Sequence, residues 1–153
     1  ENIISTAYEM MGRPYLWGGT SGKGVDCSGF TKMAFFLNGI QLPRDASQQV
    51  LVGEAVDTDT LTWKNLQPGD LLFFGRKATA EKKERITHVA IYLGDGKIIH
   101  ASERVKVESL VKGDPAYVPA RVASFVRSKR IIGQEGKNGV QKLADLPNFR
   151  HAP

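Results

Sequence analysis

Apolar residues recur at helical spacing near the start of the chain. Ile3, Ile4, Ala7 and Met11 form the first run, and a Gly-Arg-Pro segment ends it, so a helix over 3–11 is expected. A second helix is predicted from Asp26 to about Asn38, with Gly39 as its cap. Apolar side chains nearly surround this helix, which is typical of a central position; they are Phe30, Met33, Ala34, Phe35, Phe36 and Leu37.

Two shorter segments follow the same logic. Tyr15-Leu16-Trp17 predicts an extended piece that leads into a glycine-rich loop through Gly24. A third helix is expected over Asp45–Val52, where Asp45 is the N-cap and Gln48 completes a capping box.

Beyond residue 67 the pattern changes to that of strands. Pro68-Gly69-Asp70 predicts a turn, and the tail from Gly133 is polar and expected to be irregular. Strands are predicted at Leu71–Phe74, Thr87–Leu93, Lys97–Ser102, Arg104–Val111 and Phe125–Ile132. Helices first and antiparallel strands afterwards indicate an α+β fold in one domain that spans 1–153.

Composition agrees with a soluble globular domain, since 41% of the 153 residues are hydrophobic and 24% are charged. No apolar run approaches the ~20 residues of a membrane helix, so no transmembrane segment is expected. The net charge of +5 favours anionic partners, and the basic residues are densest in Arg76–Arg85 and Arg121–Arg130. Aromatic residues are not interleaved with them, so we expect no nucleic acid as a partner.

The single cysteine, Cys27, directly follows Asp26 at the start of the predicted central helix. One cysteine excludes an intrachain disulfide and a multi-cysteine zinc site, and no metal or cofactor is expected. The free N–H groups and the dipole of a helix start stabilise a thiolate, which suits a nucleophile. The alternative is an inert buried thiol.

A thiolate nucleophile needs a base, and the chain offers three histidines. His151 lies in the tail and is expected to be solvated. His88 and His100 fall inside consecutive predicted strands, where each one alone could be a satisfied core residue. Together with Cys27 they form a candidate nucleophile, base and orienting group.

The register of the predicted hairpin decides whether the two rings can meet. A two-residue Asp95-Gly96 turn would pair Ile91 with His100 and place His88 and His100 on opposite faces of the sheet. A three-residue Gly94-Asp95-Gly96 loop would place them diagonally on one face, with Gly96 left-handed. It also gathers an apolar layer on the other face, namely Val89, Ile91, Leu93, Ile99 and Ala101. We therefore predict the three-residue loop.

These residues resemble the NlpC/P60 family of cell-wall peptidases, within the papain-like cysteine peptidase superfamily. The match runs in the family's order from about Gly12 to Ser102. Its segments are Pro14-Tyr15-Leu16-Trp17-Gly18-Gly19, Asp26-Cys27-Ser28-Gly29-Phe30, Leu42-Pro43-Arg44-Asp45, Gln67-Pro68-Gly69-Asp70-Leu71-Leu72-Phe73-Phe74, His88-Val89-Ala90-Ile91-Tyr92-Leu93-Gly94 and Ile99-His100-Ala101-Ser102.

The resemblance implies a catalytic triad of Cys27, His88 and His100. It also implies hydrolysis of the bond between γ-D-glutamate and an L-diamino acid in peptidoglycan stem peptides, through a thiol acyl-enzyme. The substrate-binding residues that it implies are Tyr15, Trp17, Asp26, Ser28, Arg44, Asp45 and Ser47. Plainer interpretations remain: Tyr15 and Trp17 as packing residues, Asp26 and Asp45 as helix caps, and Ser28 as support for the first cap.

One departure from the family pattern concerns the residues after Arg44-Asp45, because Ala46 precedes Ser47 and either could face a ligand. The long basic segment Gly75–Ile86 is a solvated loop or a basic rim that attracts carboxylate-rich peptides. The chain begins with Glu1 and a helical pattern starts at once, so we expect a longer parent protein with an upstream domain such as an SH3-like one. The expected compartment is the bacterial envelope, periplasmic or secreted, with a cytoplasmic recycling role as the alternative.

Two rival functions remain open at this point. One is a different cysteine acyl-transfer enzyme on the same site, either an amidase or an acyltransferase. The other is a cell-wall-binding module whose cysteine is silent.

Overall fold

The computed structural model describes residues 2–11, 27–102 and 104–146. Their order along the chain is α1 (Asn2–Met11), α2 (Cys27–Phe36), β1 (Ile40–Gln41), α3 (Ala46–Gln49), β2 (Glu54–Val56), β3 (Leu71–Arg76), β4 (Arg85–Gly94), β5 (Lys97–Ser102), β6 (Arg104–Ser109), α4 (Pro119–Ser124), β7 (Phe125–Arg130), β8 (Gln141–Lys142) and a 3₁₀ turn at Leu143–Asp145. The α+β class predicted from the sequence is confirmed.

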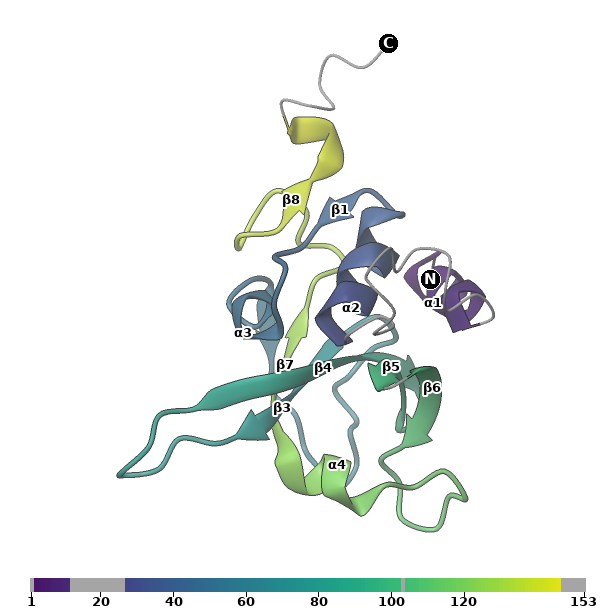
Figure 1. Ribbon diagram of the computed structural model, residues 1–153, viewed down its shortest axis with the longest axis vertical. Coiled ribbons are helices and arrows are strands. Elements are labelled where there is room, and N and C mark those ends of the chain that lie inside the picture. Colours follow the sequence, from purple (N-terminus) through teal and green to yellow (C-terminus); the bar gives the residue numbers. More distant parts are fainter. Residues whose placement is uncertain (1, 12–26, 103, 147–153) are drawn as a thin grey trace.

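A six-stranded sheet in the order β2-β7-β3-β4-β5-β6 organises the fold, and each neighbouring pair in it is antiparallel. A two-stranded sheet of β1 and β8 stands apart from it. Helices α1 and α2 lie on one side of the large sheet and α4 lies on the other (Figure 1). We name these two sides the α2 face and the α4 face.

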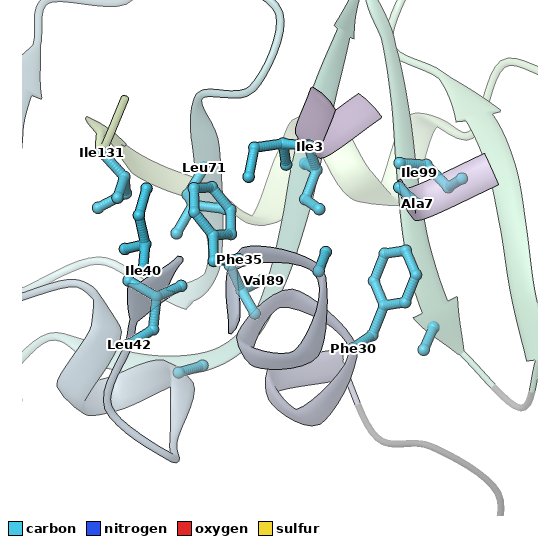
Figure 2. Packing of buried hydrophobic residues seen from close by; sticks show 14 of the residues in the cluster. Ile3, Ala7, Phe30, Phe35, Ile40, Leu42, Leu71, Val89, Ile99 and Ile131 are labelled. Atoms are coloured by element: carbon cyan, nitrogen blue, oxygen red, sulfur yellow. The ribbon is translucent and has the colours of Figure 1, made fainter. Parts of the chain in front are cut away.

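The α2 face carries the larger hydrophobic cluster, and Figure 2 shows helix side chains meeting strand side chains in it. Phe30 and Phe35 of α2 are fully buried, as are Val89 and Ile99 of the strands. Burying one such side chain contributes about 1.5–3 kcal/mol, so this layer fixes α2 against the sheet. The apolar layer predicted for the hairpin is found here, with Val89, Ile91, Ile99 and Ala101 buried and Leu93 partly buried.

The alternate residues of the strands point to the α4 face and form a second cluster. Trp63 packs edge-on against Phe125, with ring centroids 5.3 Å apart, and Phe74 packs against Phe125 at 6.1 Å. The sheet is therefore covered on both faces, and a polar side chain that points to either face is buried unless it lies near an edge.

The β4–β5 hairpin corrects one prediction and confirms another. Gly94 pairs with Lys97, so the turn has two residues, Asp95 at φ +52° and Gly96 at φ +75°, and not the three that we predicted. The register then shifts between Tyr92 and Gly94, and Ile91 pairs with Ile99. The predicted three-residue loop gives the same pairing of Ile91 with Ile99. A bulge near Leu93 therefore shifts the register by the one residue that we had assigned to the loop.

Helix α2 ends at Phe36, two residues before the predicted end, and Leu37 is 61% exposed although its spacing placed it in the apolar stripe. Helix α3 keeps the predicted N-cap Asp45 and the capping box with Gln48, but it ends at Gln49 and does not reach Val52. The tail is more ordered than we predicted, because β8 pairs with β1 and Val140 is buried.

The basic segment between β3 and β4 is a hairpin that projects from the body of the molecule (Figure 1). The side chains of residues 76–83 are exposed, as both the solvated loop and the basic rim require. Within the part of the chain that the structure describes, no helix combines the length and apolar character needed to cross a bilayer.

Candidate active site

Cys27 is the first residue of α2, as the sequence predicted for a nucleophile at a helix start. Its side chain is half-buried and packs at the edge of the α2-face cluster, so the sulfur is not sealed in the core. Helix α2 itself packs against β4 and β5, the two strands that carry the histidines.

The two predicted histidines meet. Nε2 of His88 lies 2.6 Å from Nδ1 of His100, and the rings are nearly perpendicular with centroids 4.8 Å apart. His100 is completely buried, whereas His88 is half-buried. Both rings therefore project to one side of the hairpin, as the predicted register requires.

Both histidines lie beyond the stretch in which β4 and β5 are paired, which runs from Gly94 and Lys97 to Ile91 and Ile99. On its other side His88 is paired with Phe74 of β3, and the two rings contact each other at 5.8 Å between centroids. Since side chains alternate along a strand, both rings lie on the α4 side of the strands, next to Phe74 and Arg121.

Glu108 of β6 extends this array, and sequence reasoning missed it. Its Oε1 lies 2.8 Å from Nε2 of His100 and accepts a hydrogen bond from Nε of Arg121 at 3.1 Å. The ammonium group of Lys106 lies 3.7 Å from Oε2. Because His100 pairs with Lys106 across the strands, Glu108 is the diagonal neighbour of His100 on the same face.

Electrostatics keep both imidazoles neutral at pH 7. Burial lowers the pKa of His88 to about 3, assisted by His100 and Arg121. Burial also lowers the pKa of His100 to about 4, against the opposing effect of Glu108. For Glu108, burial alone would raise the pKa, but His100 and Arg121 outweigh it and the pKa lies below its ordinary value. The array is thus an ionised carboxylate followed by two neutral rings.

A buried polar network supports the helix start that carries Cys27. The amide nitrogen of Gln49 donates to the carbonyls of Ser28 and Pro43, at 3.1 and 3.0 Å. Its Oε1 lies 2.7 Å from the hydroxyl of Thr31, which donates a hydrogen bond to it. Gln49 is completely buried, so this network ties the first turn of α2 to the segment before α3.

The other predicted site residues divide into three groups. Ser28 and Arg44 are brought together, since Nη1 of Arg44 donates to the hydroxyl of Ser28 at 3.0 Å. Asp45 caps α3, Ala46 is buried and Ser47 is exposed, so Ser47 is the one of that pair that faces solvent. Tyr15, Trp17 and Asp26 lie outside the described residues. Among the described residues, no group of three or more His, Cys, Asp or Glu side chains is arranged to hold a metal ion.

An α+β domain with a thiol at the start of its central helix and a hydrogen-bonded histidine pair on the adjoining strands defines a papain-like class of fold and site. The chain belongs to the NlpC/P60 family, whose model matches residues 12–123.

Two proteins named gamma-D-glutamyl-L-lysine dipeptidyl-peptidase are similar to this chain. The one from Bacillus cereus (strain ATCC 10987 / NRS 248) is 38% identical over 132 residues, which are 86% of this chain and 36% of that protein. The one from Bacillus subtilis (strain 168) is 43% identical over 118 residues, which are 76% of this chain and 37% of that protein. The chain thus spans just over a third of the length of these relatives.

Solved structures agree with the fold. The crystal structure of an NlpC/P60 family protein from Bacillus cereus ATCC 10987 is 39% identical with a TM-score of 0.61, and the match covers 84% of this chain and 39% of that one. RipD from Mycobacterium tuberculosis, described as a non-catalytic NlpC/p60 domain protein adapted to peptidoglycan binding, is 24% identical with a TM-score of 0.57, over 86% of this chain and 95% of that one. The likeness to RipD concerns the fold alone.

Proposed function

We propose that this domain is a cysteine peptidase that hydrolyses the γ-D-glutamyl–L-diamino acid bond of peptidoglycan stem peptides. The observation that carries the proposal is the His88–His100 hydrogen bond on the strands against which the Cys27 helix packs. The names of the two Bacillus relatives support the bond specificity, because both state a γ-D-glutamyl-L-lysine substrate.

In the proposed mechanism His88 is the general base and His100 orients it. Nε2 of His88 is engaged by His100, so Nδ1 is the nitrogen that takes the thiol proton of Cys27. The sulfur attacks the γ-D-glutamyl carbonyl carbon, and the tetrahedral adduct collapses as the proton passes from His88 to the departing amine. Water then gives a proton to His88 and attacks the thioester, and the carboxylate product leaves as the thiol regains its proton.

Burial keeps the His88 ring neutral at pH 7, which is the form that accepts a proton, and the same burial makes the ring a weaker base. The oxyanion of the adduct would lie at the start of α2, where the N–H of Cys27 and a neighbouring group can donate to it.

Substrate recognition is proposed for Tyr15, Trp17, Asp26, Ser28, Arg44, Asp45 and Ser47 by resemblance to the family. Of these, Ser28 and Arg44 are already bonded to each other. Arg44 is exposed and Ser28 is buried beneath the helix start, so Arg44 is the member of the pair that would reach a substrate carboxylate.

The broader setting is also a proposal. We infer that residues 1–153 form one catalytic domain of a longer chain with an upstream domain, since the Bacillus relatives are nearly three times as long as the stretch that matches. The corresponding compartment is the bacterial envelope.

Digestion of purified stem peptides tests the function. Peptides ending in lysine or diaminopimelate, with and without a blocked N-terminus, are incubated with the parent protein and with Cys27→Ala, and the products are identified by mass spectrometry. We expect the parent to release the dipeptide L-Ala-γ-D-Glu and Cys27→Ala to release none. Products of a different acyl transfer would indicate an amidase or an acyltransferase. Binding without turnover, equal in parent and Cys27→Ser, would indicate a wall-binding module.

A further inference from the structure

The hydrogen-bonded array does not end at His100. Glu108 stands behind it at 2.8 Å with a side chain that is only 13% exposed, and Arg121 stands behind Glu108 at 3.1 Å. The array therefore crosses four elements, from β4 through β5 and β6 to α4. A carboxylate at this position determines which ring nitrogens of the two histidines carry protons.

The direction of the array follows from the carboxylate. An ionised carboxylate only accepts, so Nε2 of His100 must carry the proton that lies toward Glu108. In a neutral His100 the other nitrogen, Nδ1, is then an acceptor, and Nε2 of His88 must donate to it. Nδ1 of a neutral His88 is left without a proton, and that is the form a base requires.

We propose that Glu108 is a positioning residue that, through His100, holds His88 in the one neutral tautomer able to take the thiol proton of Cys27. This role rests on the proposed peptidase function. Glu108 is not a catalytic residue in this proposal. It acts through the imidazoles of His100 and His88, which are hydrogen-bonded in series.

Cations on neighbouring elements keep the carboxylate in its accepting form. Arg121 of α4 shares Oε1 with His100, and Lys106 of β6 faces Oε2. The guanidinium of Arg121 also lies over the ring of Phe74, 5.9 Å from its centroid, and Phe74 packs against His88. One side chain thereby fixes both the last member of the array and the packing of the base.

The reaction leaves Glu108 unchanged. When Nδ1 of His88 takes the proton of the thiol, its Nε2 proton stays between the two rings, and the carboxylate stabilises the positive charge that develops on the pair. Reversed tautomers would place a proton on Nδ1 of His88 and block the first step, without altering any contact of the substrate.

Substitutions at residue 108 separate this role from a structural one. Glu108→Met removes the acceptor, and we expect kcat to fall roughly 10- to 100-fold, as for loss of a hydrogen bond to a charged group, with KM within about 3-fold of the parent. Glu108→Gln keeps an oxygen for His100, and we expect it to restore most of kcat. The matched control is Glu84→Gln, which removes the carboxylate that precedes β4 and pairs with Arg127 of β7; among the described residues this pair has no hydrogen bond to a histidine.

The decisive readout is the ¹⁵N spectrum of the histidine rings, which reports the protonated nitrogen of each ring directly. We expect protons on Nε2 of both His88 and His100 in the parent, in Glu108→Gln and in Glu84→Gln, and a proton on Nδ1 of His88 in Glu108→Met. Parent tautomers in a folded Glu108→Met would overturn the proposal. If that variant does not fold, a change of kcat in Glu108→Gln with unchanged tautomers would overturn it instead.

These spectra need no turnover, so they also separate the two proposals. A parent with the expected tautomers but no cleavage of stem peptides would contradict the proposed function and leave the role of Glu108 in place. Cleavage of stem peptides by a parent in which Nε2 of His100 carries no proton would support the proposed function and overturn the role of Glu108.

Discussion

Asp70 and Glu108 are carboxylates that each bind an arginine, and they differ in what else they bind. Asp70, directly before β3, accepts from Nε and Nη2 of Arg130 at 3.0 and 2.9 Å and from the N–H of Gln67 at 2.9 Å. Glu108 accepts from Arg121 and from His100. Every donor to Asp70 keeps its proton at any physiological pH, whereas His100 can shift a proton between its two nitrogens.

The difference separates structural from functional use of the same ion pair. Asp70 closes a turn and joins β3 to β7, and the donors that bind its carboxylate in the described part of the chain, Arg130 and the N–H of Gln67, do not titrate near neutrality. The Glu108 side chain is 13% exposed against 3% for Asp70, the two arginines are similarly exposed, and two neutral imidazoles continue from Glu108. Breaking the Asp70 network should therefore change stability, and breaking the Glu108 array should change the reaction.

The largest effect is expected at the open end of the array. His88→Gln removes the base and keeps a polar group beside His100, so kcat on a γ-D-glutamyl-linked stem peptide should fall about 10²- to 10⁴-fold, the usual contribution of general base catalysis. Steady-state kinetics with the purified variant measure this, and thermal unfolding checks that the fold is kept. Activity within a few-fold of the parent would show that the histidine pair is only a packing feature.

Asp70→Asn tests the other carboxylate. Asp70 is 2% exposed, and an amide in its place turns one acceptor into a donor facing Arg130 or Gln67. We expect the free energy of unfolding to fall by about 2–4 kcal/mol in denaturant titrations, with kcat per folded molecule unchanged. A loss of kcat at full stability would mean that the two ion pairs are not distinct in kind.

The sequence predicts the histidine pair because side-chain alternation along a strand is a local rule. The register between Ile91 and Ile99 follows from the requirement that Val89, Ile91, Ile99 and Ala101 share one apolar face. The predicted length of the turn was wrong, because a two-residue turn with a bulge gives the same register as a three-residue loop. Hydrophobic pattern therefore identifies the face of a side chain better than it identifies the turn.

The sequence does not predict the roles of Glu108 and Arg121, for different reasons. Glu108 sits among alternating valines on an edge strand, where a charged residue is ordinarily solvated, and only its diagonal position across from His100 marks it. Arg121 lies on α4, six residues long, which periodicity cannot detect; Pro119 at its first position was the available signal. Gln49 was missed because a buried glutamine has no pattern of its own.

The pH dependence of stability distinguishes the two regions further. Since burial lowers the pKa of both histidines, the unfolded chain binds protons below pH 6.5 that the folded chain does not bind until about pH 4 for His100 and about pH 3 for His88. Stability therefore falls as pH falls through that window, by at most ~1.4 kcal/mol per pH unit for each histidine.

His88→Gln removes one of these groups, so its slope between pH 6.5 and about 4 should be shallower than that of the parent by up to ~1.4 kcal/mol per unit. Asp70→Asn keeps both histidines and should keep the parent's slope over the same range. Denaturant titrations at half-unit pH intervals measure both slopes. Equal slopes in the parent and His88→Gln would show that the ring of His88 is as easily protonated as an exposed one.

The smallest effect is expected from a third carboxylate, that of Glu84, directly before β4. Glu84 accepts a hydrogen bond from Nε of Arg127 at 3.2 Å, but the two side chains are 27% and 50% exposed. Water can therefore replace the hydrogen bonds that the substitution removes. Glu84→Gln should change the free energy of unfolding by less than about 0.5 kcal/mol, and less still at high salt, as surface ion pairs do. A loss above 1 kcal/mol would contradict this expectation. It would also contradict the premise that burial and the nature of the other donor decide what Asp70, Glu84 and Glu108 contribute to stability or catalysis, and that the carboxylate–guanidinium contact itself does not.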